Sequence, residues 1–232
     1  MHVLTSGLAA AVVAHLDAPN PWFSRTFVTE NKDLLTTATK EHVQLVLYSV
    51  GLGLLISLPL AVLVRGRRRL TGLLLGATGV VYTIPSLALF GVLAPITGLT
   101  LKTAVIALTA YSLLILVRNV LIGLEGVSNE VRDAARGMGM GRGRLLMTVE
   151  LPLATPSILA GVRIATVSNV ALATVGVVVA HGGLGTVIFR GFRSNFYRAE
   201  IMTGTLLCVA LALVAELLFL GLERFATPWA RR

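Results

Sequence analysis

The residues that could carry out chemistry in this chain are few and lack catalytic spacing. A phosphate-binding loop needs Gly-x-x-x-x-Gly-Lys followed by Ser or Thr, yet the only lysines, Lys32, Lys40 and Lys102, follow Asn, Thr and Leu. The four histidines form no H-E-x-x-H or similar metal-ligand spacing, and no Gly-x-Ser-x-Gly nucleophile motif is present. The sequence therefore predicts no catalytic residue, no metal site and no cofactor bound by this chain.

Three ionisable residues, Arg118, Arg163 and Glu216, lie inside long apolar stretches, where burying a charge is costly. One interpretation is a proton or ion relay. The interpretation that we favour is structural: the arginines extend to the membrane interface while Glu216 finds a polar partner among the helices. Arg118 is the candidate partner.

The composition indicates the class of protein that positions these residues. Of the 232 residues, 55% are hydrophobic and only 13% are charged, and the mean hydropathy is +0.83. This number of charged residues is too small to cover the surface of a soluble domain of this length. The sequence therefore predicts a membrane protein. The net charge of +9 comes from basic residues between apolar runs, which indicates the membrane surface rather than nucleic acid as the partner.

Five stretches are long and apolar enough to cross a hydrocarbon core of roughly 30 Å as helices. They are residues 42–64, 71–94, 102–124, 154–180 and 202–224. Apolar and polar residues do not alternate, so the expected fold is an all-α polytopic transmembrane helix bundle. Residues 1–40 are expected to form an extracytoplasmic segment, 41–224 the transmembrane domain and 225–232 a cytoplasmic tail. Residues 3–16 are expected to form a surface helix, with a signal-like segment as the alternative.

The distribution of arginine predicts the orientation, because short loops rich in Lys and Arg stay in the cytoplasm. The loop 65–69 carries four arginines, and further arginines lie between the third and fourth spans and in the C-terminal tail. With five spans these segments share one side, so the N-terminus is expected outside and the C-terminus in the cytoplasm. Arg190, Arg193 and Arg198 fall on the outer side, and their stretch is expected to be partly buried rather than a free loop.

The polar segment 125–153 has the pattern of two short helices joined by a glycine turn. Ser128 can cap the first helix, whose acids Glu130 and Asp133 suit its positive end. Glycine then occupies every second position of residues 137–143, which permits a turn with positive φ. Pro152 lies where a new helix can start.

This segment resembles the cytoplasmic loop of ABC importer permeases. Their pattern is E-A-A, three residues, G, nine residues and I-x-L-P, and here Asp133-Ala134-Ala135, Gly139 and Val149-Glu150-Leu151-Pro152 keep every spacing. Asp for Glu and Val for Ile are mild departures. In that family the loop is a coupling helix that docks on a separate ATPase subunit; the alternative is an ordinary solvated amphipathic loop. The resemblance assigns ATPase coupling to Glu130, Asp133, Ala134, Ala135, Gly139, Leu151 and Pro152.

The resemblance covers roughly residues 34–222 and extends to the branch that imports glycine betaine, carnitine and choline. It rests on stretches such as Glu41-His42, Tyr82-Thr83-Ile84-Pro85-Ser86 and Gly182-Gly183-Leu184-Gly185. It implies a bundle of the methionine-importer type, a second copy or a related permease chain, a pair of ATPase subunits that bind ATP and Mg, and an extracytoplasmic binding protein. One alternative is an importer of another small solute such as an amino acid. The other is an ion-coupled secondary transporter.

A translocation path is expected where polar residues and a helix break interrupt the spans. Proline in the second span removes a backbone donor and exposes carbonyls, and tyrosine faces attract a permanent cation. The candidate path residues are Tyr82, Pro85, Ser86, Tyr111, Ser168 and Asn169. Packing and interhelical hydrogen bonding are the alternative roles. Gly182, Gly183 and Gly185 are candidates for an outer gate or a site for the binding protein.

Overall fold

The structure is a computed structural model that describes residues 20–179 and 182–227, and every regular element in these ranges is helical. The elements are α2 (Arg25–Glu30), α3 (Lys32–Val64), α4 (Arg68–Thr83), α5 (Ser86–Thr97), α6 (Leu101–Glu125), α7 (Asn129–Gly137), α8 (Arg142–Leu145), a π-helical turn η1 (Leu146–Glu150), α9 (Leu151–Ala173), a 3-10 turn η2 (Val175–Val178), α10 (Leu184–Arg193) and α11 (Arg198–Ala226). The expected surface helix 3–16 and the end of the tail, 228–232, lie outside the described residues.

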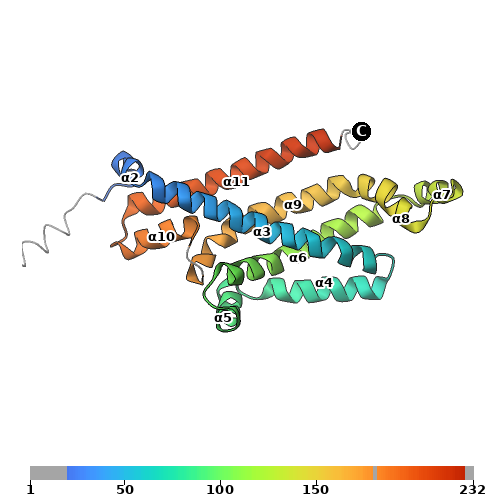
Figure 1. Cartoon of the computed structure of the whole chain (residues 1–232), viewed down its shortest axis with the longest axis horizontal. Helices are drawn as coiled ribbons and strands as arrows, with labels where there is room; N and C mark the ends of the chain where they lie inside the picture. The colour runs from blue at the N-terminus through green and yellow to red at the C-terminus, as the bar shows by residue number, and fades with distance from the viewer. Residues whose placement is uncertain (1–19, 180–181, 228–232) are drawn as a thin grey trace, which may run out of the picture.

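The long helices α3, α6, α9 and α11 run along the long axis of the molecule (Figure 1). Four helical segments of the described chain are each long and apolar enough to cross a membrane, and a fifth crossing results if the bent pair α4–α5 counts as one span. The expected all-α transmembrane bundle is confirmed. The α3, α6 and α9 helices form its centre, and their facing side chains, including Leu108, Leu116 and Val170, are buried.

The second expected span, 71–94, is not one straight helix. The axes of α4 and α5 differ in direction by 94°, with the break at Ile84 and Pro85. Pro85 lacks an N–H and restricts the residue before it to extended conformations, and Ile84 has φ −67° and ψ 128°. The hydroxyl of Tyr111 on α6 donates a hydrogen bond of 2.5 Å to the Ile84 carbonyl, which replaces a helical donor at the bend.

The fourth expected span also differs from the structure. Its helix α9 ends at Ala173 rather than at residue 180, and it continues backwards through η1 and α8 to Arg142, so that the second half of the expected loop is helical. Proline in a helix collides with the carbonyl four residues earlier, which for Pro152 belongs to Thr148. The wide η1 turn contains Thr148 and accommodates this proline without ending the helix.

Small residues allow α6 and α9 to approach closely. A Cβ atom at Gly161 of α9 would lie 2.5 Å from Cβ of Asn119 on α6, a distance that real contacts do not show. Farther along the same pair, the Asn169 amide donates to the Ser112 hydroxyl at 2.9 Å, and both side chains are buried. Close contact and interhelical hydrogen bonding are the main sources of helix association in lipid, so this pair stabilises the centre of the bundle.

Candidate functional site

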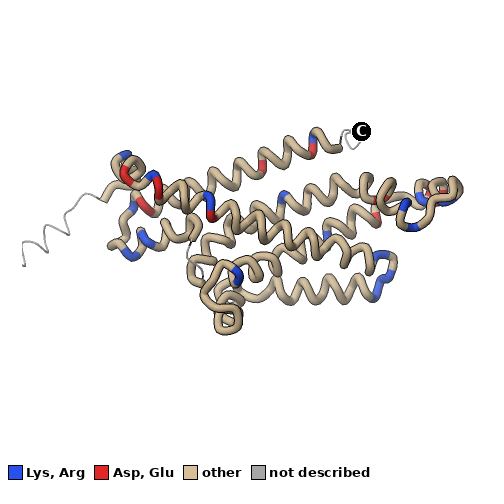
Figure 2. Tube along the Cα trace, in the orientation of Figure 1, with Lys and Arg blue, Asp and Glu red and all other residues tan. Residues whose placement is uncertain are grey.

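Lys and Arg lie at both ends of the bundle (Figure 2), and we call the end that contains the α3–α4 turn, α7 and α8 the arginine-rich end. It contains the α3–α4 turn, residues 65–69, and the segment of α7 and α8, residues 129–145. The opposite end contains α2 and α10 and is called the α10 end. The coupling residues expected from the sequence therefore lie together at the arginine-rich end.

Local sequence explains where α7 begins and ends. Ser128 is its N-cap, and the Ser128 hydroxyl accepts a hydrogen bond of 3.4 Å from the N–H of Val131. Hydrogen bonds from the backbone N–H of Glu130 itself and from the Ser128 side chain lower the pKa of the Glu130 carboxyl, so Glu130 is charged beside the positive helix end. The helix ends at Gly137, Gly139 has φ +81°, and the Met140 N–H donates to the Ala135 carbonyl at 3.1 Å.

The α7 helix has one free apolar face and one packed face. Val131, Ala134 and Met138 follow the spacing i, i+3, i+7 and are exposed, with Met138 at 70%. Ala135, by contrast, is only 2% exposed. Asp133 is also exposed and pairs with Arg136 at 3.1 Å. This small, shallow apolar face is suited to lie in a groove of another protein.

A buried carboxylate fixes the position of α7. Glu150 is 4% exposed and lies at the junction of η1 and α9. Its Oε2 accepts from Arg65 Nη1 at 2.5 Å and its Oε1 accepts from Arg132 Nε at 3.0 Å. Arg132 Nη2 also donates to the Leu124 carbonyl at 2.6 Å. The carboxylate thus joins the α3–α4 turn, α7 and the η1 turn that leads into α9, and Arg132 extends the network to α6.

Sequence reasoning missed this network, because Glu150 occupies the variable position of the I-x-L-P pattern. A signal was present: Glu150 is an acid between apolar residues, Val149 and Leu151, on the side where both arginine-rich segments were expected. Leu151 is half-buried and Pro152 is exposed, so their contribution is to the shape of the helix junction rather than to this network.

The α4–α5 bend brings four candidate path residues together. The rings of Tyr82 and Tyr111 pack edge to face, with centroids 5.9 Å apart, beside Pro85 and Ser86. Tyr82 is 42% exposed, whereas Tyr111 is buried. Ser168 and Asn169 are on α9 instead, and the Asn169 amide donates to Ser112, the residue that follows Tyr111 on α6.

The partner of Glu216 is Arg163 rather than the expected Arg118. Arg163 Nη1 lies 3.6 Å from the Glu216 carboxylate and 3.5 Å from that of Glu223, two turns farther along α11. The physical reason is packing: α11 lies against α9, which carries Arg163, whereas Arg118 is on α6. A single arginine held between two acids favours the structural interpretation of these charges over a relay.

Reversing the charge of Glu216 is expected to reduce the yield of folded protein. Glu216→Lys would place a second cation beside Arg163 within a membrane-spanning helix, where like charges are poorly screened. Size-exclusion chromatography of a fluorescent fusion measures the monodisperse fraction, with Glu216→Gln as the control that removes charge without reversing it. A wild-type yield for Glu216→Lys would contradict the structural role.

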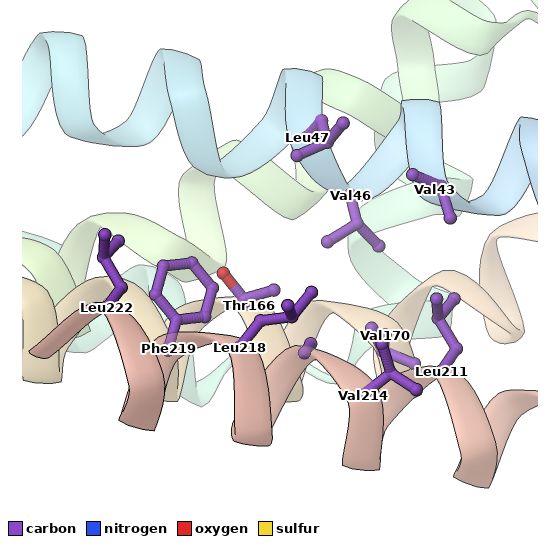
Figure 3. A pocket seen from close by; sticks show the side chains of 11 residues that line it. Val43, Val46, Leu47, Thr166, Val170, Leu211, Val214, Leu218, Phe219 and Leu222 are labelled. Atoms are coloured by element: carbon purple, nitrogen blue, oxygen red, sulfur yellow. The ribbon is translucent and has the colours of Figure 1, made fainter. Parts of the chain in front are cut away.

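An apolar groove of about 320 Å³ lies between α3, α9 and α11 (Figure 3). Its walls include Val46 and Leu47 of α3 and Leu218 and Phe219 of α11, and Thr166 has the only polar side chain among the described residues that line it. The Thr166 hydroxyl donates to the Val162 carbonyl of its own helix. The groove therefore offers no charge or free donor to a polar solute, and its chemistry matches hydrocarbon.

The glycine turn at the α10 end packs tightly. Gly182 and Gly183 have φ +128° and +76°, and a Cβ at Gly185 would lie 2.2 Å from the Thr174 carbonyl oxygen. The stretch that follows was expected to be partly buried rather than a free loop, and it forms α10. Arg190 of α10 pairs with the buried Glu200 of α11.

Gly185→Ala is expected to destabilise the protein by roughly 1–3 kcal/mol, because backbone must move to admit the methyl group. Thermal unfolding in detergent measures the effect. Gly221→Ala is the matched control, since Gly221 lies in α11 with nothing within 4 Å of its added Cβ, and it is expected to be neutral or stabilising by about 0.5–1 kcal/mol. Equal unfolding temperatures for the two variants would show that the turn is not constrained.

Comparison with known proteins agrees with this architecture. A family model described as "Binding-protein-dependent transport system inner membrane component" matches residues 50–232. The chain belongs to this family. It is therefore a multi-pass membrane component of a transport system, and the expected resemblance to ABC importer permeases is confirmed.

Curated members of the family are similar over most of their length. The carnitine transport permease protein OpuCB of Listeria monocytogenes is 36% identical, over 89% of this chain and 94% of the relative. The glycine betaine/carnitine/choline permease protein OpuCD of Bacillus subtilis is 33% identical, over 88% and 89%. The osmoprotectant import permease protein OsmW of Salmonella typhimurium is 35% identical, over 87% and 96%. All three are named as permeases rather than as enzymes.

Solved structures share the fold. An inward-facing MetNI methionine ABC transporter superposes with a TM-score of 0.76 at 22% identity, covering 88% of this chain and all of the matched chain. An amino acid ABC transporter superposes with a TM-score of 0.70 at 18% identity, covering 87% and 98%. The expected methionine-importer type of bundle is confirmed.

Proposed function

We propose that this chain is the membrane-spanning permease of an ATP-driven importer of osmoprotectants such as glycine betaine, carnitine and choline. The proposal that the chain couples to an ATPase rests on α7. This helix exposes the side chains of Val131, Ala134 and Met138, and its Arg132 is bound by the buried Glu150. The solute class is supported by the names of relatives that are 33% to 36% identical over most of the chain. These solutes share a permanently cationic quaternary ammonium group.

The arginine-rich end lies in the cytoplasm, because arginine-rich turns stay on that side of the membrane. There α7 docks on a separate pair of ATPase subunits, which bind ATP and Mg, since this chain contains no phosphate-binding loop. The N-terminus and the α10 end face outward, where an extracytoplasmic binding protein delivers the solute. A second copy or a related permease chain completes the path, and the largely exposed apolar surface of α11 is available to it or to lipid.

The path is proposed to pass the α4–α5 bend. The exposed ring of Tyr82 offers a π face to a quaternary ammonium group. The helix break at Pro85 and Ser86 places backbone polar groups near this ring. Buried Tyr111 supports this arrangement through the Ile84 carbonyl. Ser168 is a further candidate on α9, whereas Asn169 is proposed to act through its bond to Ser112.

Reconstitution tests the proposal. Proteoliposomes containing this chain, its ATPase and its binding protein are expected to take up labelled glycine betaine only with ATP and the binding protein, and ionophores are expected not to stop uptake. ATPase association without uptake of glycine betaine, carnitine or choline would retain the permease and reject the solute class; methionine uptake in the same vesicles would identify an amino-acid importer. Uptake driven by an ion gradient without the ATPase would overturn the proposal.

A further inference from the structure

Two neighbouring side chains of α3 hold the start of α10. Glu41 Oε2 accepts a hydrogen bond of 3.0 Å from the N–H of Gly183, and His42 Nδ1 accepts one of 3.2 Å from the N–H of Leu184. These two N–H groups belong to the N-cap and the first residue of α10, where no intrahelical acceptor exists. Side chains from a helix far away in the sequence therefore cap α10.

His42 has no exposed surface, and both of its ring nitrogens are used. Nε2 lies 3.0 Å from the carbonyl oxygen of Val170 on α9. An amide N–H can only donate and a carbonyl can only accept. The ring therefore carries its proton on Nε2, and the lone pair of Nδ1 accepts from Leu184. One imidazole thus joins α3, α9 and α10 in a defined tautomer.

Space around the turn is fitted to these two side chains. A Cβ at Gly182 would lie 2.9 Å from Glu41 Oε2, and a Cβ at Gly183 would lie 3.1 Å from His42 Nδ1. The other end of α10 is also tied to its surroundings, because Arg190 pairs with Glu200 of α11 and donates to Asn31 at the start of α3. The start of α10 is therefore held by α3, and its other end by both α11 and the start of α3.

The helix α3, which holds the start of α10, and its neighbour α9 also hold the coupling segment. At the arginine-rich end, Arg65 directly follows α3 and binds Glu150, which directly precedes α9. At the α10 end, the same two helices meet at His42 and Val170. A displacement of α7 that moves α3 and α9 is consequently passed to α10 through the His42 contacts.

From this arrangement we infer that His42, assisted by Glu41, is a positioning residue that makes α10 move with α3 and α9 during transport. This inference rests on the proposed function. Loss of the ring hydrogen bonds leaves the ATPase site unchanged. Docking of the binding protein at the outer face then no longer affects the rate of ATP hydrolysis. The quantity that we expect to change is the stimulation of ATPase activity by the binding protein, because α10 lies at the opposite end of the bundle from α7.

The test compares variants in the reconstituted complex at equal amounts of folded protein. His42→Phe keeps the ring volume and removes both hydrogen bonds, and we expect at least about a tenfold loss of maximal uptake and of binding-protein stimulation, with basal ATPase unchanged. His42→Gln supplies one acceptor and one donor and is expected to recover uptake to within about threefold of wild type. Ser49→Ala is the matched control, because the buried Ser49 hydroxyl donates within its own helix, to the Leu45 carbonyl, and has no other bond among the described residues.

Glu41 supplies an independent arm if His42→Phe does not fold. Glu41 is half-buried, and Glu41→Leu removes the acceptor for Gly183 while Glu41→Gln retains one. We expect Glu41→Leu to lose binding-protein stimulation and Glu41→Gln to keep it. Full stimulation in folded His42→Phe or in Glu41→Leu would overturn the inference, as would a His42→Gln variant no better than His42→Phe. An inactive wild-type complex would instead count against the proposed function.

Discussion

Glu150→Gln is expected to destabilise the protein by roughly 3 kcal/mol, because it leaves two arginines beside a buried, uncharged partner. The side chain of Glu150 is 5% exposed, and those of Arg65 and Arg132 are 23% and 19% exposed, so water replaces little of the lost interaction. The apparent Tm is expected to fall by roughly 6–12 °C. Because Arg132 of α7 then loses its charged partner and keeps only its weaker contacts, ATPase binding is expected to weaken as well.

The same loop contains a matched control for this variant. Asp133 and Arg136 also form an ion pair, at 3.1 Å, but their side chains are 71% and 62% exposed. Asp133→Asn is therefore expected to change stability by less than about 1 kcal/mol. Thermal unfolding of both variants in the same detergent compares the buried Glu150 network with the exposed Asp133–Arg136 pair. Equal Tm values would mean that the Glu150 network does not support the fold.

Ala134→Trp is expected to abolish docking of the ATPase without changing the stability of the permease. Ala134 lies in the exposed apolar face of α7, so an indole there meets solvent in the isolated chain but obstructs a partner. We expect the Kd for the ATPase subunit to rise by at least about tenfold, equivalent to about 1.4 kcal/mol, with an unchanged Tm. ATP-dependent uptake is expected to fall in parallel.

The neighbouring alanine gives the opposite pattern. Ala135 is 2% exposed, so Ala135→Trp has no room and is expected to displace α7 and lower the Tm. Binding of the ATPase to the two variants in lipid nanodiscs, together with their unfolding temperatures, separates docking from folding. Unchanged ATPase affinity in a folded Ala134→Trp variant would show that this face of α7 is not the docking surface.

Features that depend on local sequence could be predicted before the structure was known. The helical class and the apolar stretches follow from composition, because lipid permits only helices or closed barrels. The start of α7 after Ser128 and its end at the glycines that begin with Gly137 follow from capping chemistry within a few residues. The spacing from Asp133 to Pro152 was sufficient to indicate the transport family, since it lies within one continuous segment.

Features that depend on which helices meet required the tertiary structure. Pro85 was recognised as a break, but the direction of α5 depends on its packing beside α6 and on the bond from Tyr111. Glu216 was paired with the wrong arginine, because hydropathy does not say that α11 packs on α9. Helix pairing in lipid depends on close contact between small residues and on a few polar bonds, which residue types along one chain do not specify. For the same reason the carboxylate of Glu150 and the imidazole of His42, each joining segments far apart in sequence, became apparent only in the folded chain.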